Sequence, residues 1–179
     1  SGITIGLGYD LGHVTSAQMS KDLDGLMSKE NITALSVCCG VTGERSKLLI
    51  SQLQHISFSW EAACELFYKK SLPKYCKLAS FAYPELETLH PYEQTAIVGL
   101  VYNRGADTSN TTQRKEMRQL IQAIKDDNDA LMSGIIKNMK RLWDKNKQGG
   151  LHVRRALEAA FIAMPDTPIP EADKLIVIF

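Results

Sequence analysis

The segment PYEQTAIVGLVYNRG, residues 91–105, is the part of this sequence that most strongly indicates a fold. Apolar side chains fill most positions of its middle part, so a helix over 92–104 is apolar around most of its circumference. Pro91 suits the first turn of such a helix, and Gly105 suits its C-terminal stop. A helix of this kind must be covered on all sides. We therefore predict a mainly α fold in which the other helices pack around 92–104.

The chain before this stretch predicts helices of modest length with recognisable caps. Ser, Thr, Asp and Asn accept hydrogen bonds from the first free N–H groups of a helix. On that basis we expect caps at Thr15 or Ser16, Ser28, Thr42 and Ser59, with the helices reaching about Met27, Gly40, Leu53 and Lys70. Pro73 is expected to start the next short helix, because proline fits a first turn and disrupts an interior.

The chain after residue 105 predicts three more helices and an extended tail. Apolar residues at helical spacing mark helices over 117–124 and 131–142, the second capped by Asp127 or Asp129. Gly149 and Gly150 are expected to break the chain before a helix over 151–163. The proline-rich segment 164–170 is predicted to be extended, and 174–179 to form a short strand or an edge packed on the body.

Composition sets the class of protein. The chain has 179 residues, 44% hydrophobic and 23% charged, with a net charge of +1, which favours one soluble domain and gives no general attraction to nucleic acid or membrane. Its apolar runs are far shorter than the roughly 20 residues of a membrane-spanning helix. The sequence that begins at Ser1 shows no recognisable secretion signal. Export as part of a larger protein remains an alternative.

No cofactor or metal motif is found. The cysteines, at positions 38, 39, 64 and 76, form no CxxC pair, so we expect packed thiols and no zinc site, with a bridge from Cys64 to Cys76 left open. Glycines 6, 8 and 12 miss the dinucleotide-binding spacing by one position. The basic residues at 114–118 and 137–147 are expected to be solvated helix faces.

Two segments carry groups suited to a binding or catalytic cleft. ITIGLGYDLGH, residues 3–13, places Asp10 and His13 on a glycine-broken turn after a short β-branched run. This pattern fits a strand edge that lines a cleft, and equally an ordinary glycine-rich hairpin. The phrase YNR at 102–104 ends the apolar helix in hydrogen-bonding groups. These groups either form a cleft wall or satisfy the last carbonyls of the helix.

Three segments together resemble the lysozyme superfamily, specifically phage endolysins and pesticin-like muramidases. They are ITIGLGYDLGH at 3–13, QTAIVGLVYNRG at 94–105 and GGLHVRRALEAAF at 149–161. The turn is most similar to the C-terminal lysozyme-like domain of type VI secretion spike proteins of the valine-glycine-repeat family. The resemblance implies an α+β fold, with a helical lobe around a central apolar helix and a small N-terminal hairpin lobe. It also implies that 1–179 is a single domain from the C-terminal part of a longer chain.

The resemblance further implies cleavage of the β-1,4 glycosidic bonds of peptidoglycan. It identifies Asp10 as the one catalytic carboxylate within this sequence and gives Thr4 a water-positioning role. The glutamate that acts as general acid is expected upstream of Ser1. The common phage turn has histidine where this chain has Tyr9, so Asp10 is not equated with the phage aspartate. Residues expected to contact sugar or peptide groups are Tyr9, His13, Tyr102, Asn103 and Arg104.

The same resemblance implies a biological setting. We expect a secreted antibacterial effector that acts in the periplasm of a target bacterium on peptidoglycan glycan strands. A cognate immunity protein would occupy its cleft. Neither nucleic acid nor membrane insertion is expected, and no cofactor. A phage endolysin, a chitosanase-like hydrolase and a non-catalytic wall-binding module remain alternatives.

Overall fold

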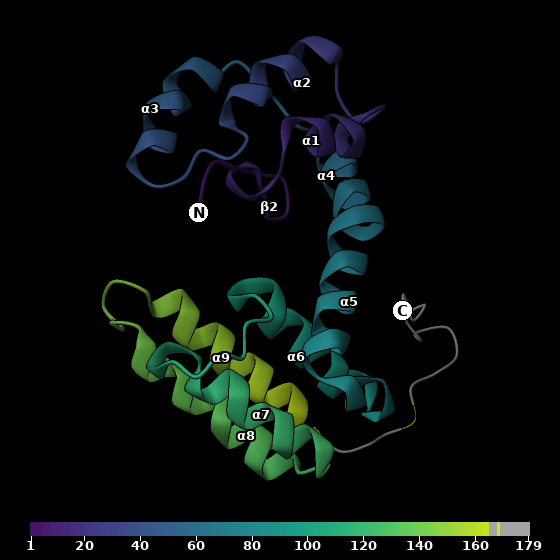
Figure 1. Cartoon of the computed structure of the whole chain (residues 1–179), viewed down its shortest axis with the longest axis vertical. Helices are drawn as coiled ribbons and strands as arrows, with labels where there is room; N and C mark the ends of the chain where they lie inside the picture. The colour runs from purple at the N-terminus through teal and green to yellow at the C-terminus, as the bar shows by residue number, and fades with distance from the viewer. Residues whose placement is uncertain (165–167, 169–179) are drawn as a thin grey trace. The chain divides into compact units, whose positions relative to one another are not determined.

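The computed structural model describes residues 1–164 and residue 168. The chain divides into two compact units, which we call unit 1 (Ser1–Lys74) and unit 2 (Tyr75–Phe179), and the boundary falls inside a helix (Figure 1). The described part is mostly helical and includes one small two-stranded antiparallel sheet. The predicted mainly α class with an N-terminal hairpin is thereby confirmed.

Unit 1 begins with the predicted hairpin. Strands β1 (Thr4–Ile5) and β2 (Tyr9–Asp10) pair antiparallel, and the loop between them turns through Gly6 and Gly8, whose φ angles are 52° and 98°. These positive values explain the glycines, because other residues rarely adopt them. The strand β2 leads directly into the short 3₁₀ helix η1 (Leu11–His13).

The hairpin is held close to the start of the chain by a contact between two backbones. A Cβ atom on Gly12 would lie 2.8 Å from the Cα of Gly2, and one on Gly2 would clash with the carbonyl oxygen of Val41. Only glycine permits this approach.

The helices that follow η1 in unit 1 contribute side chains to a small apolar core. They are α1 (Ser16–Leu23), α2 (Lys29–Leu35), η2 (Ser36–Cys38), α3 (Glu44–Leu53) and α4 (Trp60–Leu66). The predicted caps Thr15, Ser28 and Ser59 are confirmed, since each side chain accepts a hydrogen bond from the N–H three residues later. The predicted cap Thr42 is wrong: α3 starts after Gly43, whose φ of 64° no capping side chain favours. The helix α1 stops at Leu23, short of Met27, with Gly25 at φ 77° following it.

The proline at 73 lies within a nearly uninterrupted helical run. A π-helical turn, η3 (Phe67–Ser71), joins α4 to α5 (Leu72–Ala82), so Pro73 is the second residue of its helix. The N–H of Leu72 donates to the carbonyl of Phe67, five residues back. Because proline has no N–H to donate, this wide turn directly before Pro73 lets the chain continue without a loop.

Unit 2 is a helical bundle that contains the predicted central helix. Its elements are η4 (Pro84–Thr88), α6 (Pro91–Arg104), η5 (Thr112–Arg114), α7 (Lys115–Lys125), α8 (Asp129–Asn138), η6 (Met139–Leu142) and α9 (Gly149–Ile162). The helix α6 contributes Ala96, Ile97, Leu100 and Val101 to a core that also contains side chains of α5, η4, α7, α8, η6 and α9. Its apolar pattern thus explains why it is surrounded.

Two predicted helix starts in unit 2 need correction. The cap of α8 is Asn128, whose Oδ1 accepts from the N–H of Leu131, so neither Asp127 nor Asp129 has this role. The helix α9 already includes Gly149 and Gly150 in its first turn. The predicted extended segment 164–170, apart from residues 164 and 168, and the predicted strand at 174–179 lie outside the described residues.

All four cysteines are free thiols, so the bridge left open between Cys64 and Cys76 is not formed. Burial raises the pKa of Cys38, Cys39 and Cys76, as expected for packed thiols. None of the described helices has the length and apolarity needed to cross a lipid bilayer.

Truncation of the central helix tests this architecture. We expect Leu100→Ala, at a fully buried position of α6, to lower the free energy of unfolding by about 2–5 kcal/mol, because it leaves a cavity in the core. Leu157→Ala on α9, whose leucine is 58% exposed, is the matched control and should change it by less than about 0.5 kcal/mol. Urea unfolding measures both. Equal effects of the two substitutions would contradict the assigned core.

Candidate functional site

The Asp10 carboxylate uses its two oxygens differently. Its Oδ1 accepts hydrogen bonds from the backbone N–H groups of Gly2 and Gly12, both at 2.9 Å. Its Oδ2 lies 3.8 Å from the Nε2 atom of His13 and has no hydrogen bond within the described part of the chain. The side chain is 21% exposed. One oxygen therefore organises the backbone, and the other is available to a ligand.

Thr4 lies directly across the hairpin from Asp10. The register pairs Thr4 with Asp10, and residues paired in this way have Cβ atoms about 4.5–5.5 Å apart on the same face. Thr4 is exposed, and the His13 side chain is 68% exposed. The fold thus brings three predicted site residues together, and we call Thr4, Asp10 and His13 the hairpin site. It offers a carboxylate oxygen, a hydroxyl and an imidazole to one ligand.

Tyr9 points away from the hairpin site, because successive residues of a strand face opposite sides. The ring belongs to the core of unit 1, and the hydroxyl donates a hydrogen bond of 2.8 Å to Oδ2 of Asp22. The Nε2 of Gln18 donates to the other oxygen of Asp22. Burial, followed by the contact with Asp22, raises the pKa of Tyr9. The sequence predicts that Tyr9 contacts the ligand, but its hydroxyl group instead donates a hydrogen bond to Asp22 in the interior of unit 1.

A second group of predicted residues lines a pocket in unit 2. The pocket has a volume of about 230 Å³ and is lined by Asn103, Arg104, Gln113, Arg114, Trp143 and Leu151. The Nη2 of Arg104 donates to the carbonyl of Gln113 at 2.6 Å, while its Nε is buried without a hydrogen-bond partner among the described residues. The neighbouring Tyr102 does not line this pocket and instead packs edge-on against Tyr75, with ring centroids 4.7 Å apart.

Sequence reasoning missed Trp143, the aromatic wall of this pocket. Its ring lies 5.1 Å from the guanidinium carbon of Arg104 and 5.7 Å from that of Arg155. Both distances suit cation–π attraction. The signal in the sequence was one tryptophan inside a basic segment, which we had interpreted only as a solvated face.

Buried charge fixes the position of the second arginine. Arg155 is fully buried and donates from Nη2 to Oε1 of Glu158 at 2.6 Å. The adjacent Arg154 donates to the same oxygen and to the carbonyl of Gly99 on α6. The segment at 149–161 that carries part of the resemblance therefore holds α9 against α6 and places a guanidinium group near the Trp143 ring.

Two of the arginines expected to be solvated are held by hydrogen bonds and ion pairs within unit 2. Arg141 donates from Nε and Nη2 to the two oxygens of the buried Glu116, at 2.6 and 2.9 Å. Arg114 donates to the carbonyl of Arg104 and lies 3.3 Å from Oδ2 of Asp107. The prediction of freely solvated side chains is wrong for these positions, because each meets an acceptor from a distant part of the chain.

The Glu116 pair predicts a pH-dependent contribution to stability. Burial is the largest single influence and disfavours the charged carboxylate. The hydrogen bonds from Arg141, a backbone hydrogen bond and the Arg141 charge together outweigh it and hold the pKa of Glu116 below its ordinary value. A lowered pKa contributes stability above the unfolded value of about 4.3, and this is lost as pH falls through the folded value. Glu116→Gln should therefore cost about 1–3 kcal/mol near pH 7.

The measurement is urea unfolding of wild type and Glu116→Gln between about pH 7 and about pH 3. The difference between them should shrink towards acid pH. Glu87→Gln removes the same charge at an exposed position of unit 2 and should show little difference at either pH. A Glu116→Gln cost that stays constant over this range would contradict an ionised, paired Glu116.

Comparison with known proteins gives a family but no activity. No curated protein and no solved structure matches the chain. A family model with the description "Domain of unknown function" matches residues 1–145, which include the hairpin site and the pocket tryptophan. That match covers most of the 179 residues. The chain belongs to this family, DUF8812.

Proposed function

We propose that this chain is a lysozyme-like peptidoglycan hydrolase that cleaves β-1,4 glycosidic bonds of the bacterial cell wall. One observation carries the proposal: the hairpin register sets Thr4 opposite Asp10, with Oδ2 of Asp10 not engaged by the backbone. The resemblance of three ordered segments to lysozyme-like enzymes gives the reaction class.

Glycoside hydrolysis needs a protonated carboxyl group for the leaving oxygen and a second group across the sugar. In this proposal Asp10 is the second group: Oδ2 takes a proton from a water molecule as that water attacks the anomeric carbon. Thr4 holds the water through its hydroxyl. The proposal assigns the general acid to a glutamate in the natural sequence upstream of Ser1, as the resemblance implies. A separation of about 6.5–9.5 Å between the two carboxyl groups would fit inversion.

We propose that the pocket of unit 2 binds a polar group of the peptidoglycan polymer. An aromatic ring face beside hydrogen-bonding side chains suits a sugar, and a guanidinium suits the carboxylate of a stem peptide. Asn103 and Arg104 supply the polar groups and Trp143 the ring. His13 is the corresponding contact at the hairpin site.

The biological setting proposed is that of an exported antibacterial effector acting in the periplasm of a target cell. Such an enzyme endangers its producer, so we propose an immunity protein that covers the exposed edge of Asp10. A phage endolysin would share the hairpin chemistry without such a partner.

Asp10→Asn tests the proposal without disturbing the hairpin. The amide oxygen of asparagine still accepts the N–H bonds from Gly2 and Gly12, while the basic carboxylate is removed. We expect muropeptide release from purified peptidoglycan to fall by about 10²–10⁴-fold, the usual contribution of a general base. The assay uses the chain extended by its natural upstream sequence, in parallel with residues 1–179.

Asp24→Asn, at an exposed position of unit 1, is the matched control and should keep full activity. Unchanged release by Asp10→Asn would exclude Asp10 as the base. If no form releases muropeptides but all sediment with peptidoglycan, the chain is a wall-binding module. Release from chitosan in place of peptidoglycan would indicate a chitosanase-like hydrolase.

A further inference from the structure

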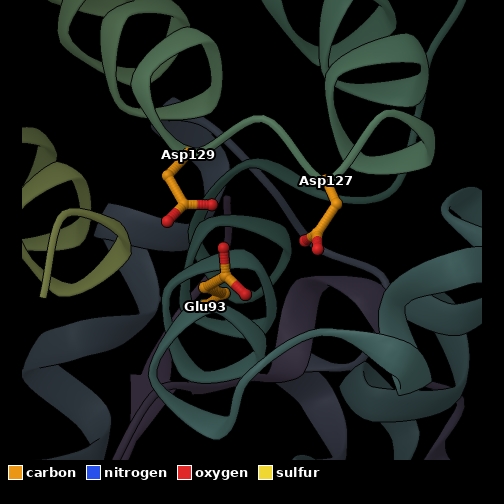
Figure 2. A group of neighbouring side chains, drawn as sticks. All are labelled: Glu93, Asp127 and Asp129. Carbon is orange, nitrogen blue, oxygen red and sulfur yellow. The ribbon is translucent and has the colours of Figure 1, made fainter. Parts of the chain in front are cut away.

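A cluster of three carboxylates lies in unit 2, apart from the pocket residues. Glu93 comes from the first turn of α6, Asp127 from the connection between α7 and α8, and Asp129 from the first residue of α8. One oxygen of each lies within 4.8 Å of the other two. Figure 2 shows the three side chains converging from these elements.

Glu93 is the buried member of the cluster. Its residue is 4% exposed, and its Oε2 accepts the N–H of His90 at 2.8 Å as part of a capping box. Its Oε1 is buried and has no hydrogen-bond donor among the described residues. In Figure 2 the Glu93 carboxylate faces the carboxylates of Asp129 and Asp127. A buried carboxylate oxygen without a donor is costly, so it calls for a partner.

The surrounding charge makes this cost larger. The charged groups that act on Glu93 are Asp127 and Asp129, both of the same sign as Glu93 itself. No lysine or arginine of the described chain is among them. Like charges this close repel one another strongly in a partly buried setting. A bound cation would remove the repulsion and give Oε1 its partner.

We propose that Glu93, Asp127 and Asp129 bind a hard divalent cation, with Ca²⁺ as the best fit. Ca²⁺ takes six to eight oxygen ligands at about 2.3–2.6 Å, so two of its ligand oxygens lie at most about 5 Å apart. Three carboxylates supply three to six of these oxygens, and water completes the shell. The set has no histidine or cysteine to favour a transition metal.

The ion would tie the start of α6 to the α7–α8 connection. Asp127 and Asp129 are exposed, which leaves a route for the ion and room for its water ligands. This role concerns the stability of unit 2 and holds whether or not the chain hydrolyses peptidoglycan.

Calorimetric titration of the chelator-treated chain with CaCl₂ tests the site. We expect one Ca²⁺ per chain with a dissociation constant on the order of 10⁻⁴–10⁻³ M, as in extracellular sites with few protein ligands. Asp129→Asn and Asp127→Asn should each weaken binding about tenfold or more, and Glu93→Gln should abolish it. Glutamine at 93 still offers an oxygen to the N–H of His90, so the capping box is kept.

Asp126→Asn is the matched control, because it removes the same charge from an exposed neighbour outside the cluster. It should bind Ca²⁺ like the wild type, and a Ca²⁺ concentration near the wild-type dissociation constant should raise the thermal midpoint of both by more than that of Asp129→Asn. Absence of saturable binding would overturn the proposal. If Asp126→Asn and Asp129→Asn weakened Ca²⁺ binding equally, the proposal would also be overturned, because the binding would then be a diffuse electrostatic attraction.

Discussion

The hairpin of unit 1 depends on one carboxylate oxygen. Oδ1 of Asp10 accepts the N–H groups of Gly2 and Gly12, which joins the start of the chain to the turn that follows β2. The backbones of these two glycines meet so closely that neither tolerates a side chain. Because Oδ1 is fixed in this way, Oδ2 has a fixed direction as well, beside the paired Thr4. The constraint that builds the hairpin is therefore also the one that orients the second carboxylate oxygen of Asp10.

In unit 2, buried charged pairs fix the positions of side chains in a similar way. Burying Arg155 is costly unless the charge is paired, and the hydrogen bond to Glu158 supplies that pairing. The Trp143 ring then lies near two guanidinium groups, those of Arg155 and Arg104, and forms one wall of the pocket. Buried pairs of this kind fix the position of side chains more than they add to stability, and here they lie beside one wall of the pocket. The Glu93 cluster differs, because its charges all have one sign.

Local signals predicted the elements well and their exact starts less well. The caps Thr15 and Ser59 and the apolar helix α6 follow from the residues themselves. At the start of α8 three consecutive residues, 127–129, all suit a cap, and only the course of the chain selects Asn128. Only part of the candidate site could be predicted from the sequence. Thr4, Asp10 and His13 are neighbours in sequence, whereas the pocket and the carboxylate cluster join residues from separate helices that no periodicity connects.

We propose that a glycan binds at the Thr4 and Asp10 end of the hairpin. A ¹H–¹⁵N NMR titration of the Asp10→Asn chain with a tetrasaccharide of alternating N-acetylglucosamine and N-acetylmuramic acid, which this variant should cleave about 10²–10⁴-fold more slowly, tests this binding. If the glycan binds there, the largest amide shift changes within unit 1 will occur at Thr4, residue 10 and His13, and they will saturate together. Saturable changes elsewhere in unit 1 that leave these three amides unmoved would contradict it.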